Sequence, residues 1–501
     1  MAAILALDEG TTSCRAIIFT DGGERIATAQ REFEQIYPKP GWVEHDATEI
    51  FTTQADMAKQ VLAETGLSPS DLAGIGITNQ RETVVLWDRR TGEPVHNAIV
   101  WQDRRTADLM DRWRGGGNDE MVRAKTGLLL DPYFCASKLS WLLDNVEGAR
   151  AAANDGHLAF GTIECWLLWK LSDGIVHSTD ESNACRTLLY DIHARCWDDE
   201  LLRLFDIPAS ILPEVVPCSG ELGETTMFGG MMPIRGMIGD QQSALFGQAC
   251  IQPGMAKSTF GTGCFLLMNT GEQAVESQSG LLTTIAWSTP DSKCTYALEG
   301  SVFMGGATIQ WMRDGLGIIK SAPEVNELAD SVPDSGGVVL VPAFAGLGAP
   351  YWDPWARGAI LGMTRGTTAA HVARAGLEGI ACSVTDLLHA MTNDSEISLA
   401  EVRVDGGAAA SNLLMQIQAD LLDVDVLRPT LLETTAFGAA SMAGLAAGLL
   451  DEPGAMGEHW TLDRRFTPSI DDEKRKELMS RWSQGVKRAQ HWAGDQDDDG
   501  S

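Results

Sequence analysis

The sequence predicts an α/β protein with two related domains that close on a cleft. Strand-like and helix-like segments alternate along the chain, as they do in layered α/β domains. A strand–turn–strand unit near residue 10 recurs near residue 262, which indicates a weak internal duplication. The 501 residues are too many for one compact core. We therefore expect a first domain at 1–250, a second at 251–492 and a disordered acidic tail at 493–501.

The first half of the chain opens with apolar runs that are separated by polar turns. Ala3–Leu7 and Cys14–Phe19 are short apolar segments, and the hydroxyl-rich turn Asp8–Ser13 joins them. Apolar runs bounded by turn residues are typical of strands. Further predicted elements are a strand at Arg25–Gln30, a helix at Thr48–Thr65 and a buried strand at Ala73–Thr78.

The second half of the chain repeats this order. Met255–Phe260 and Cys264–Asn269 are predicted strands on either side of the turn Gly261–Gly263. A third strand starts at Val402 and ends in an acid and two glycines, Asp405–Gly407. A helix is expected to follow, from about Ser411 to Leu422.

The formal net charge of −31 limits the partners of the protein. An acidic surface repels the phosphates of nucleic acids and anionic membranes, so we expect neither as a partner. The ten cysteines include no C-x-x-C pair. This spacing predicts neither a zinc site nor a disulfide framework and fits the reduced thiols of a cytosol.

Two segments bear on membrane insertion and secretion. Ala436–Leu450 is rich in glycine and alanine, but it is shorter than the roughly 20 residues that a bilayer span needs. We predict a tightly packed internal helix there. The N-terminal segment reaches Asp8 too early for a secretory signal. We therefore expect a cytoplasmic protein without a membrane span.

Three glycine-containing turns carry the residue types of a phosphate site. They are Asp8–Ser13, Gly261–Gly263 and Asp405–Gly407. Glycine lets the backbone approach a phosphate, and amides and hydroxyls donate to its oxygens. Asp8 can hold Mg²⁺, because hard cations take oxygen ligands. Each turn alone also fits an ordinary hairpin or a strand-to-helix connection, whereas their order and separation together indicate a phosphate-binding site.

Five longer sequence blocks extend this pattern over about residues 4–492. They are Arg31–Asp46, Gly76–Thr83, Ala98–Arg105, Gly239–Gln242 and Ala345–Pro354. With these blocks and the three turns, the chain resembles the FGGY carbohydrate kinases of the actin–hexokinase ATPase superfamily, and among them the members that phosphorylate glycerol. The resemblance implies two ribonuclease H-like (actin-like ATPase) domains that flank an interdomain cleft. It also implies ATP and Mg²⁺ as cofactors.

The resemblance further implies a glycerol site, with polar groups for the three hydroxyls and apolar walls for the carbon chain. Asp240 is the candidate general base, which accepts the hydroxyl proton as the bond to phosphorus forms. The implied substrate-binding residues are Arg81, Glu82, Trp101, Tyr133, Asp240, Gln241 and Phe265.

By the same resemblance, the phosphates of ATP lie between the domains and Mg²⁺ lies near Asp8. Closure of the domains would exclude water from the reaction. The residues implied for the phosphates are Thr11, Thr12, Ser13, Arg15 and Thr262, and those implied for the nucleoside are Gly306, Gln310, Gly407 and Ser411.

Some positions depart from the family pattern. Glu9 stands where a glutamine is usual, Phe260 replaces a tyrosine, and Ser411 replaces the asparagine that usually meets the adenine. The segment 228–233 is shorter than the glycine-rich, arginine-bearing loop of members inhibited by fructose 1,6-bisphosphate. We therefore expect no such inhibition here.

The resulting hypothesis is transfer of the γ-phosphoryl group of MgATP to glycerol, giving sn-glycerol 3-phosphate and ADP in glycerol catabolism. Relatives form homodimers and homotetramers, and we expect one of these states. Another FGGY reaction would keep the chemistry with dihydroxyacetone, glyceraldehyde or a larger sugar as acceptor. A catalytically silent, nucleotide-gated binding protein is a third possibility, but it predicts damage at Asp8 or Asp240, and both are present.

Overall fold

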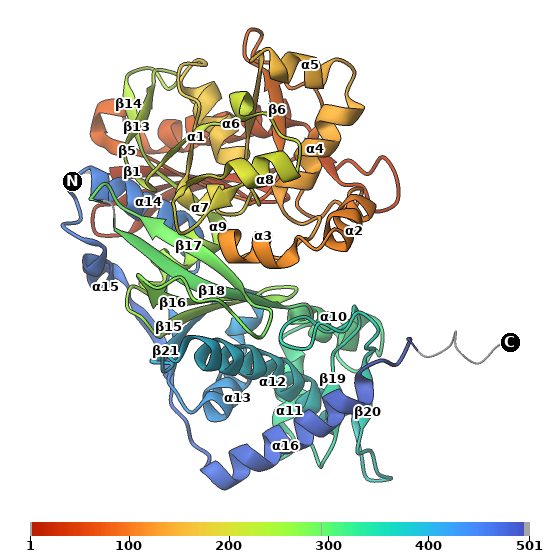
Figure 1. Cartoon of the computed structure of the whole chain (residues 1–501). Coiled ribbons are helices and arrows are strands. Elements are labelled where there is room, and N and C mark those ends of the chain that lie inside the picture. Colours follow the sequence, from red (N-terminus) through yellow and green to blue (C-terminus); the bar gives the residue numbers. More distant parts are fainter. Residues whose placement is uncertain (1–2, 292, 495–501) are drawn as a thin grey trace, which may run out of the picture.

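The computed structural model describes residues 3–291 and 293–494, which form two lobes around two large mixed β-sheets (Figure 1). The sheet of the first lobe has the strand order β13-β14-β5-β1-β2-β3, and that of the second lobe β17-β18-β16-β15-β21-β22-β23. The first sheet consists of β1 (Ala3–Glu9), β2 (Ser13–Thr20), β3 (Arg25–Glu32), β5 (Leu72–Asn79), β13 (Ser219–Thr225) and β14 (Met232–Gly239). The second consists of β15 (Met255–Phe260), β16 (Cys264–Gly271), β17 (Leu282–Ser288), β18 (Cys294–Val302), β21 (Glu401–Asp405), β22 (Val426–Pro429) and β23 (Leu462–Phe466).

The apolar strand β1 is the centre of the first sheet. It pairs in parallel with β5 and antiparallel with β2. Successive side chains of a strand point to opposite faces. Leu5 and Leu7 therefore pack with α1 (Ala47–Thr65) on one face, whereas Ile4 and Ala6 pack with α14 (Thr434–Ala446) on the other. Burial on both faces explains why β1 is almost wholly apolar.

Helix α1 has clear sequence signals at both of its ends. The Asp46 carboxylate accepts a hydrogen bond from the Thr48 amide at 2.8 Å, and it thereby satisfies one of the free amides at the helix N-terminus. Gly66 ends the helix in the left-handed conformation, with a φ of 69°. The predicted helix at Thr48–Thr65 is confirmed with a one-residue extension.

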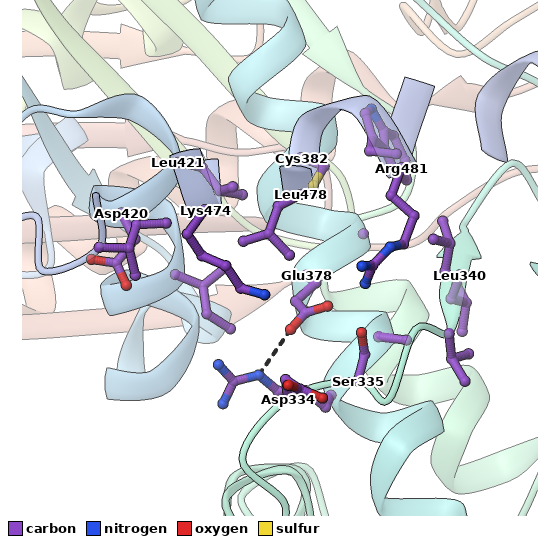
Figure 2. Close-up of a pocket in the computed structure, with 18 of the residues that line it drawn as sticks. Asp334, Ser335, Leu340, Glu378, Cys382, Asp420, Leu421, Lys474, Leu478 and Arg481 are labelled. Atoms are coloured by element: carbon purple, nitrogen blue, oxygen red, sulfur yellow. Dashed lines mark hydrogen bonds and ion pairs between the residues drawn. The ribbon is translucent and has the colours of Figure 1, made fainter. Parts of the chain in front are cut away.

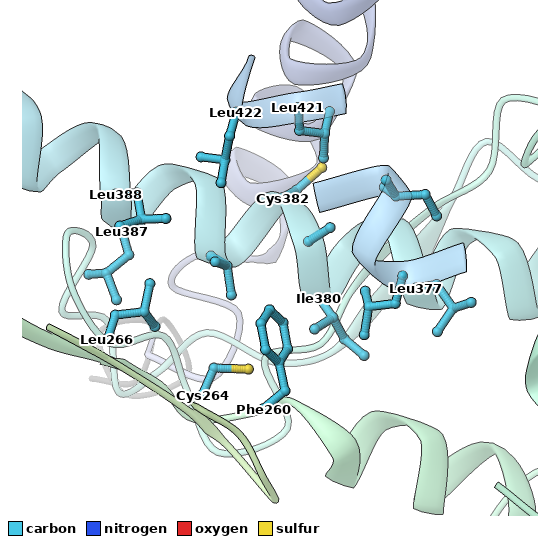
Figure 3. Packing of buried hydrophobic residues seen from close by; sticks show 14 of the residues in the cluster. Phe260, Cys264, Leu266, Leu377, Ile380, Cys382, Leu387, Leu388, Leu421 and Leu422 are labelled. Atoms are coloured by element: carbon cyan, nitrogen blue, oxygen red, sulfur yellow. The ribbon is translucent and has the colours of Figure 1, made fainter. Parts of the chain in front are cut away.

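The hydrophobic core of the second lobe lies between its sheet and the long helix α12 (Ala369–Ser395), as Figure 3 shows. Helix α13 (Asn412–Leu422) adds Leu421 and Leu422 to this core. Phe260, Cys264 and Leu266 of the sheet meet Leu377, Ile380, Cys382, Leu387 and Leu388 of α12 in the same cluster.

Helix α14 comes from the second half of the sequence but packs on the first sheet and on α9 (Asp240–Gly247), as Figure 1 shows. Small residues permit this close approach. A Cβ atom added at Gly438 would collide with the carbonyl of Ser243, and one added at Gly76 with the carbonyl of Ala439. The tightly packed internal helix predicted from composition is confirmed, although it ends at Ala446.

The other helices complete the two lobes and flank the sheets. In the first lobe they are α2 (Ala107–Gly115), α3 (Asp119–Thr126), α4 (Cys135–Asn145), α5 (Ala149–Asn154), α6 (Ile163–Leu171), α7 (Glu181–Ala184) and α8 (Asp199–Leu204). Further along the chain are α10 (Gly306–Asp314), α11 (Glu324–Asp330), α15 (Met456–His459) and α16 (Asp472–Ala489). The short strands are β4 (Glu44–His45), β6 (Val85–Asp88), β7 (Ala98–Ile99), β8 (Leu158–Gly161), β9 (Ser178–Asp180), β10 (Tyr190–Asp191), β11 (Cys196–Trp197), β12 (Glu214–Val216), β19 (Val339–Val341) and β20 (Ala359–Leu361).

The structure bears on three expectations from composition, which concern membrane spans, cysteines and the acidic tail. Within residues 3–291 and 293–494, none of the helices is long and apolar enough to cross a membrane. The ten cysteines are all free, and Cys196 alone among them is exposed. Of the acidic tail expected at 493–501, only Ala493 and Gly494 are described; the acidic run at 495–499 lies outside the described residues.

The backbone contact between α14 and α9 yields the first prediction. Gly438→Ala should lower the free energy of unfolding by about 1–3 kcal/mol, because the new methyl group would push the two helices apart. Urea denaturation measures this change. Gly115→Ala in α2 is the matched control, since no atom lies within 4 Å of its added Cβ. Equal stability of the Gly438→Ala protein and the wild type would refute the packing argument.

Candidate functional site

The first phosphate-type turn joins β1 to β2 and is partly exposed. The Gly10 amide donates to the Ser13 carbonyl at 3.0 Å and closes the hairpin. The hydroxyl of Thr12 belongs to an exposed side chain, whereas the Thr11 hydroxyl accepts a hydrogen bond from the Trp101 indole at 3.0 Å. Arg15 extends from β2, and its Nε lies 3.9 Å from the Asp8 carboxylate. The turn thus presents amides, hydroxyls and one guanidinium at the end of the sheet.

The second turn, Gly261–Gly263, joins β15 to β16 and is contacted by the start of α10. The amides of Gly305 and Gly306 donate to the carbonyls of Thr262 and Gly261, both at 2.8 Å. The third turn lies against the same place, because a Cβ on Gly406 would lie 2.6 Å from the Phe260 carbonyl. Gly406 has a φ of 87°, which favours glycine. The structure therefore brings Thr262, Gly306 and the Asp405–Gly407 turn together.

Ser411 and Gln310 are the other two residues expected near the nucleoside. The hydroxyl of Ser411 caps α13 by accepting from the Leu414 amide at 3.0 Å, and it also bonds to the Asn326 side chain. Its hydroxyl proton and one of its two acceptor positions are therefore already used. Gln310 projects as an exposed side chain from α10. The neighbouring Asn412 accepts a hydrogen bond from Arg428 at 3.1 Å.

Asp240 is the first residue of α9 and lies where the two lobes meet. Its Oδ1 accepts from the Gln241 amide at 2.7 Å and lies 3.3 Å from Nε of Arg81. Burial raises the pKa of this carboxyl group above its ordinary value, while Arg81 and Lys257 oppose the rise. The side chain retains 31% exposure. A carboxylate in this setting can accept a proton from a bound hydroxyl.

Lys257 reaches this place from β15 of the second lobe. Its ammonium group donates to Oε1 of Gln241 at 2.5 Å and to the Thr259 hydroxyl at 3.2 Å. The side chain is fully buried, and burial lowers its pKa. Lys257 therefore fixes the Gln241 amide and adds positive charge beside Asp240.

Arg81 and Glu82 follow β5 and are almost completely buried. Two N–H groups of Arg81 bond to both carboxylate oxygens of Glu299, at 2.6 and 2.9 Å. Glu82 accepts a hydrogen bond from Arg186 at 2.6 Å and has the unusual positive φ of 60°. Both side chains are therefore held by buried partners of opposite charge.

The aromatic residues expected around a carbon chain lie at the same interface. Trp101 meets Tyr133 edge to face, with ring centroids 5.5 Å apart. Phe265 pairs with Ser301 and Thr259 in the sheet, and the next residue on its face, Leu267, packs in one cluster with α9. Phe265 therefore points toward the first lobe.

Glu9 points away from the phosphate turn. Its side chain is fully buried and accepts a hydrogen bond from Gln80 at 3.1 Å, while its Oε2 has no partner. Burial raises the pKa of this carboxyl group well above its ordinary value. Burial therefore disfavours the ionised form of Glu9.

The carboxylate of Asp8 fits a role in holding Mg²⁺. Burial raises the pKa of Asp8 to about 6; Asp240 and Glu433 add to this rise, and Arg15 opposes it. No cluster of three metal-ligating side chains exists among the described residues. Mg²⁺ commonly takes one or two carboxylates and completes its shell with phosphate oxygens and water. The residues present match that pattern.

A separate cavity of about 160 Å³ lies between α12, α13 and α16, away from these residues (Figure 2). Its charged groups already have partners: Arg374 pairs with Glu378 at 3.0 Å, and Arg481 and Lys474 pair with Glu477. None of the predicted site residues lines this cavity.

Three residues of the interface were missed by sequence reasoning: Arg186, Lys257 and Glu299. Each is a single charge within an apolar segment, as in Tyr296–Gly300 around Glu299. A charged residue in a buried segment requires a partner, and this signal could have singled them out. The partners themselves are far away in sequence, so no local pattern identifies them.

Comparisons with known proteins agree over nearly the whole chain. Residues 3–247 match the N-terminal domain of the FGGY family of carbohydrate kinases, and residues 256–447 match the C-terminal domain of that family. A glycerol kinase of Rhodopirellula baltica is 57% identical over 493 residues, which are 98% of this chain and 91% of that protein. A glycerol kinase of Oleidesulfovibrio alaskensis is 56% identical over 494 residues, 98% and 99% of the two chains. The crystal structure of Plasmodium falciparum glycerol kinase with ADP has a TM-score of 0.94, 36% identity and coverage of 98% of both chains.

Lys138 supports the backbone around Tyr133 and yields the second prediction. Its buried ammonium group donates to the carbonyls of Pro132, Tyr133 and Phe134 at 2.6–3.0 Å. Lys138→Met should lower the free energy of unfolding by about 1–3 kcal/mol, because these buried carbonyls lose their donor. Urea denaturation tests this, with the exposed Lys59→Met as control. Similar stabilities of the two variants would contradict the assignment.

Proposed function

The chain belongs to the FGGY family of carbohydrate kinases, and from this premise we propose how its residues transfer the γ-phosphoryl group of MgATP to glycerol. The products are sn-glycerol 3-phosphate and ADP. One observation carries the assignment of roles: beside Asp240, Arg81 and Gln241 of the first lobe are hydrogen-bonded to Glu299 and Lys257 of the second. A carboxylate that can accept a proton therefore lies among buried cations.

Glycerol binding requires donors and acceptors for its hydroxyls and apolar contacts for its carbons. In the proposed site, Arg81 and Gln241 donate to hydroxyl oxygens, whereas Glu82 and Asp240 accept from hydroxyl groups. The ring and the hydroxyl of Tyr133 close the site. Trp101 and Phe265 pack against the carbon chain.

Asp240 is the proposed general base. As the terminal hydroxyl oxygen of glycerol forms its bond to the γ-phosphorus, Asp240 accepts the hydroxyl proton, and the bond from phosphorus to the β–γ bridging oxygen breaks to release ADP. The reaction depends chiefly on alignment and on charge neutralisation. Asp8 would hold Mg²⁺, whose charge would offset that of the phosphate oxygens. Arg81 and Lys257 stabilise the ionised form of Asp240 before transfer.

The proposed nucleotide site uses both lobes. Thr11, Thr12, Ser13 and Arg15 face the phosphates from the first, and Thr262 faces them from the second. Gly306, Gln310, Gly407 and Ser411 surround the nucleoside. The division into domains at 1–250 and 251–492 would let closure bring these groups together and exclude water that otherwise hydrolyses ATP.

The acceptor is tested by ADP release measured with and without glycerol in a coupled assay. We expect release to depend on glycerol and to be much slower with xylulose or dihydroxyacetone. Faster turnover of either alternative acceptor would reassign the substrate. Absence of turnover with all three, despite nucleotide binding, would favour a silent binding protein.

We propose that the protein forms a homodimer or a homotetramer. We also propose that it is located in the cytoplasm. The free cysteines suit a reducing compartment. We predict a mass of two or four chains by light scattering at micromolar concentration. A monomer under these conditions would contradict the proposed assembly.

The role of Asp240 yields a direct mutational prediction. Asp240→Asn should lower kcat by at least ~10²-fold, as expected for loss of a positioned base, while binding of glycerol and MgATP is largely kept. Steady-state kinetics and equilibrium titrations measure the two effects. Asp119→Asn is the matched control, because Asp119 is also the first residue of a helix but is exposed. Near-normal turnover of Asp240→Asn would remove Asp240 from the role of base.

A further inference from the structure

Arg81, Arg186, Glu82 and Glu299 form a closed ion network beneath the proposed glycerol site. Arg81 holds Glu299 through two hydrogen bonds of 2.6 and 2.9 Å. Arg186 bonds to Glu299 at 3.0 Å and to Glu82 at 2.6 Å. Nε of Arg81 lies 3.7 Å from the Glu82 carboxylate. Each member thus contacts both members of opposite charge.

The network is buried and balanced in charge. The side chains of Arg81, Glu82 and Arg186 are at most 1% exposed, and that of Glu299 is 6% exposed. Although burial opposes ionisation of Glu299, the guanidinium groups of Arg186 and Arg81 hold its pKa at about 2. Glu299 therefore stays ionised at the near-neutral pH at which an enzyme works. Removal of one member would leave a buried charge without its partner, which is costly.

The four residues come from both lobes. Arg81 and Glu82 follow β5, and Arg186 follows α7, all in the first lobe. Glu299 is part of β18 in the second lobe. Glu299 therefore joins two residues that are 218 and 113 positions earlier in the chain. Separation of the lobes would break these contacts.

The hydrogen bonds of the network leave only some polar atoms of Arg81 and Glu82 free to bind a ligand. Glu299 and Gln242 take both N–H groups of Nη1 and one of Nη2 of Arg81. The edge that carries Nε faces Asp240. Oε1 of Glu82 accepts from Arg186, and no hydrogen bond among the described residues involves its Oε2. Glu299 and Arg186 thereby orient the free edges of Arg81 and Glu82.

Close packing leaves Arg81 little freedom. A Cβ on Gly239 would lie 2.8 Å from Cδ of Arg81, so the glycine before Asp240 makes room for this side chain. Glu82 holds a φ of 60°, a conformation that a non-glycine residue adopts only when its surroundings impose it. The bond from Arg186 is one such constraint.

We propose that Glu299 and Arg186 are positioning residues, which hold Arg81 and Glu82 in their glycerol-binding orientation only when the two lobes are together. This rests on the proposed function and names two residues beyond those assigned to substrate contact. The network makes the second lobe part of the glycerol site without any direct contact to glycerol. Polyol binding therefore favours the closed arrangement that the phosphate transfer also needs.

Glu299→Gln tests this role because it keeps the shape of the side chain and removes its charge. We expect the Kd and KM for glycerol to rise by at least ~10-fold, the scale of one lost charge-assisted hydrogen bond. The Kd for ADP should change by less than about twofold, since no proposed nucleotide residue belongs to the network. Trp101 beside Tyr133 provides a fluorescence signal for the glycerol titration. Arg186→Lys should show the same pattern, and it serves in place of Glu299→Gln if that variant fails to fold.

Glu378→Gln is the matched control. It removes the charge from another Arg–Glu pair of the second lobe, which is 3.0 Å long, largely buried and remote from the site. Its kinetic constants should equal those of the wild type. Unchanged glycerol affinity in both Glu299→Gln and Arg186→Lys would overturn the proposal, as would an equal loss of ADP and glycerol affinity. Failure of the wild type to phosphorylate glycerol would instead refute the proposed function, so the two failures can be told apart.

Discussion

The bidentate pair between Arg81 and Glu299 connects the two lobes at the point where the proposed chemistry occurs. It explains several features together. Arg81 is neutralised in a buried place, its remaining edge is directed at Asp240, and the second sheet is fixed against α9. Lys257 adds a second contact between the lobes, a single hydrogen bond to the side-chain oxygen of Gln241. In a protein with a formal net charge of −31, these few placed cations offset the buried carboxylates around Asp240.

The fold was largely predictable from local patterns in the sequence. The strand Met255–Phe260 has the expected bounds, and the strand expected at Ala3–Leu7 extends to Glu9. Apolar runs between glycine-rich turns mark these strands clearly. The position of α14 was not predictable from its pattern, since a helix of small residues can pack on any close surface. Its location on the first sheet follows from the glycines that face it from β5 and α9, which only the three-dimensional structure pairs with it.

The candidate site was predictable where residues lie in turns or sequence blocks, and less so where single charges act over long distances. Asp8, Asp240 and Arg81 stand in recognisable segments. Glu299 and Arg186 do not, because their meaning depends on partners that are more than a hundred positions away. Ser411 lies in a recognisable segment, but the structure shows a role for it that the sequence did not indicate. Its sequence position indicated a nucleoside contact, yet its hydroxyl caps α13 and bonds to Asn326. Whether it also meets a nucleoside stays a prediction.

The central claim is that residues of both lobes form one site for phosphoryl transfer. A crystal structure with glycerol and ADP tests this most directly. We expect glycerol against Arg81, Glu82 and Asp240, with a terminal hydroxyl within about 3 Å of the Asp240 carboxylate. This hydroxyl should be directed toward the phosphates of ADP between the Asp8 and Thr262 turns. Glycerol bound elsewhere, or a nucleotide whose phosphates lie away from Asp240, would contradict it.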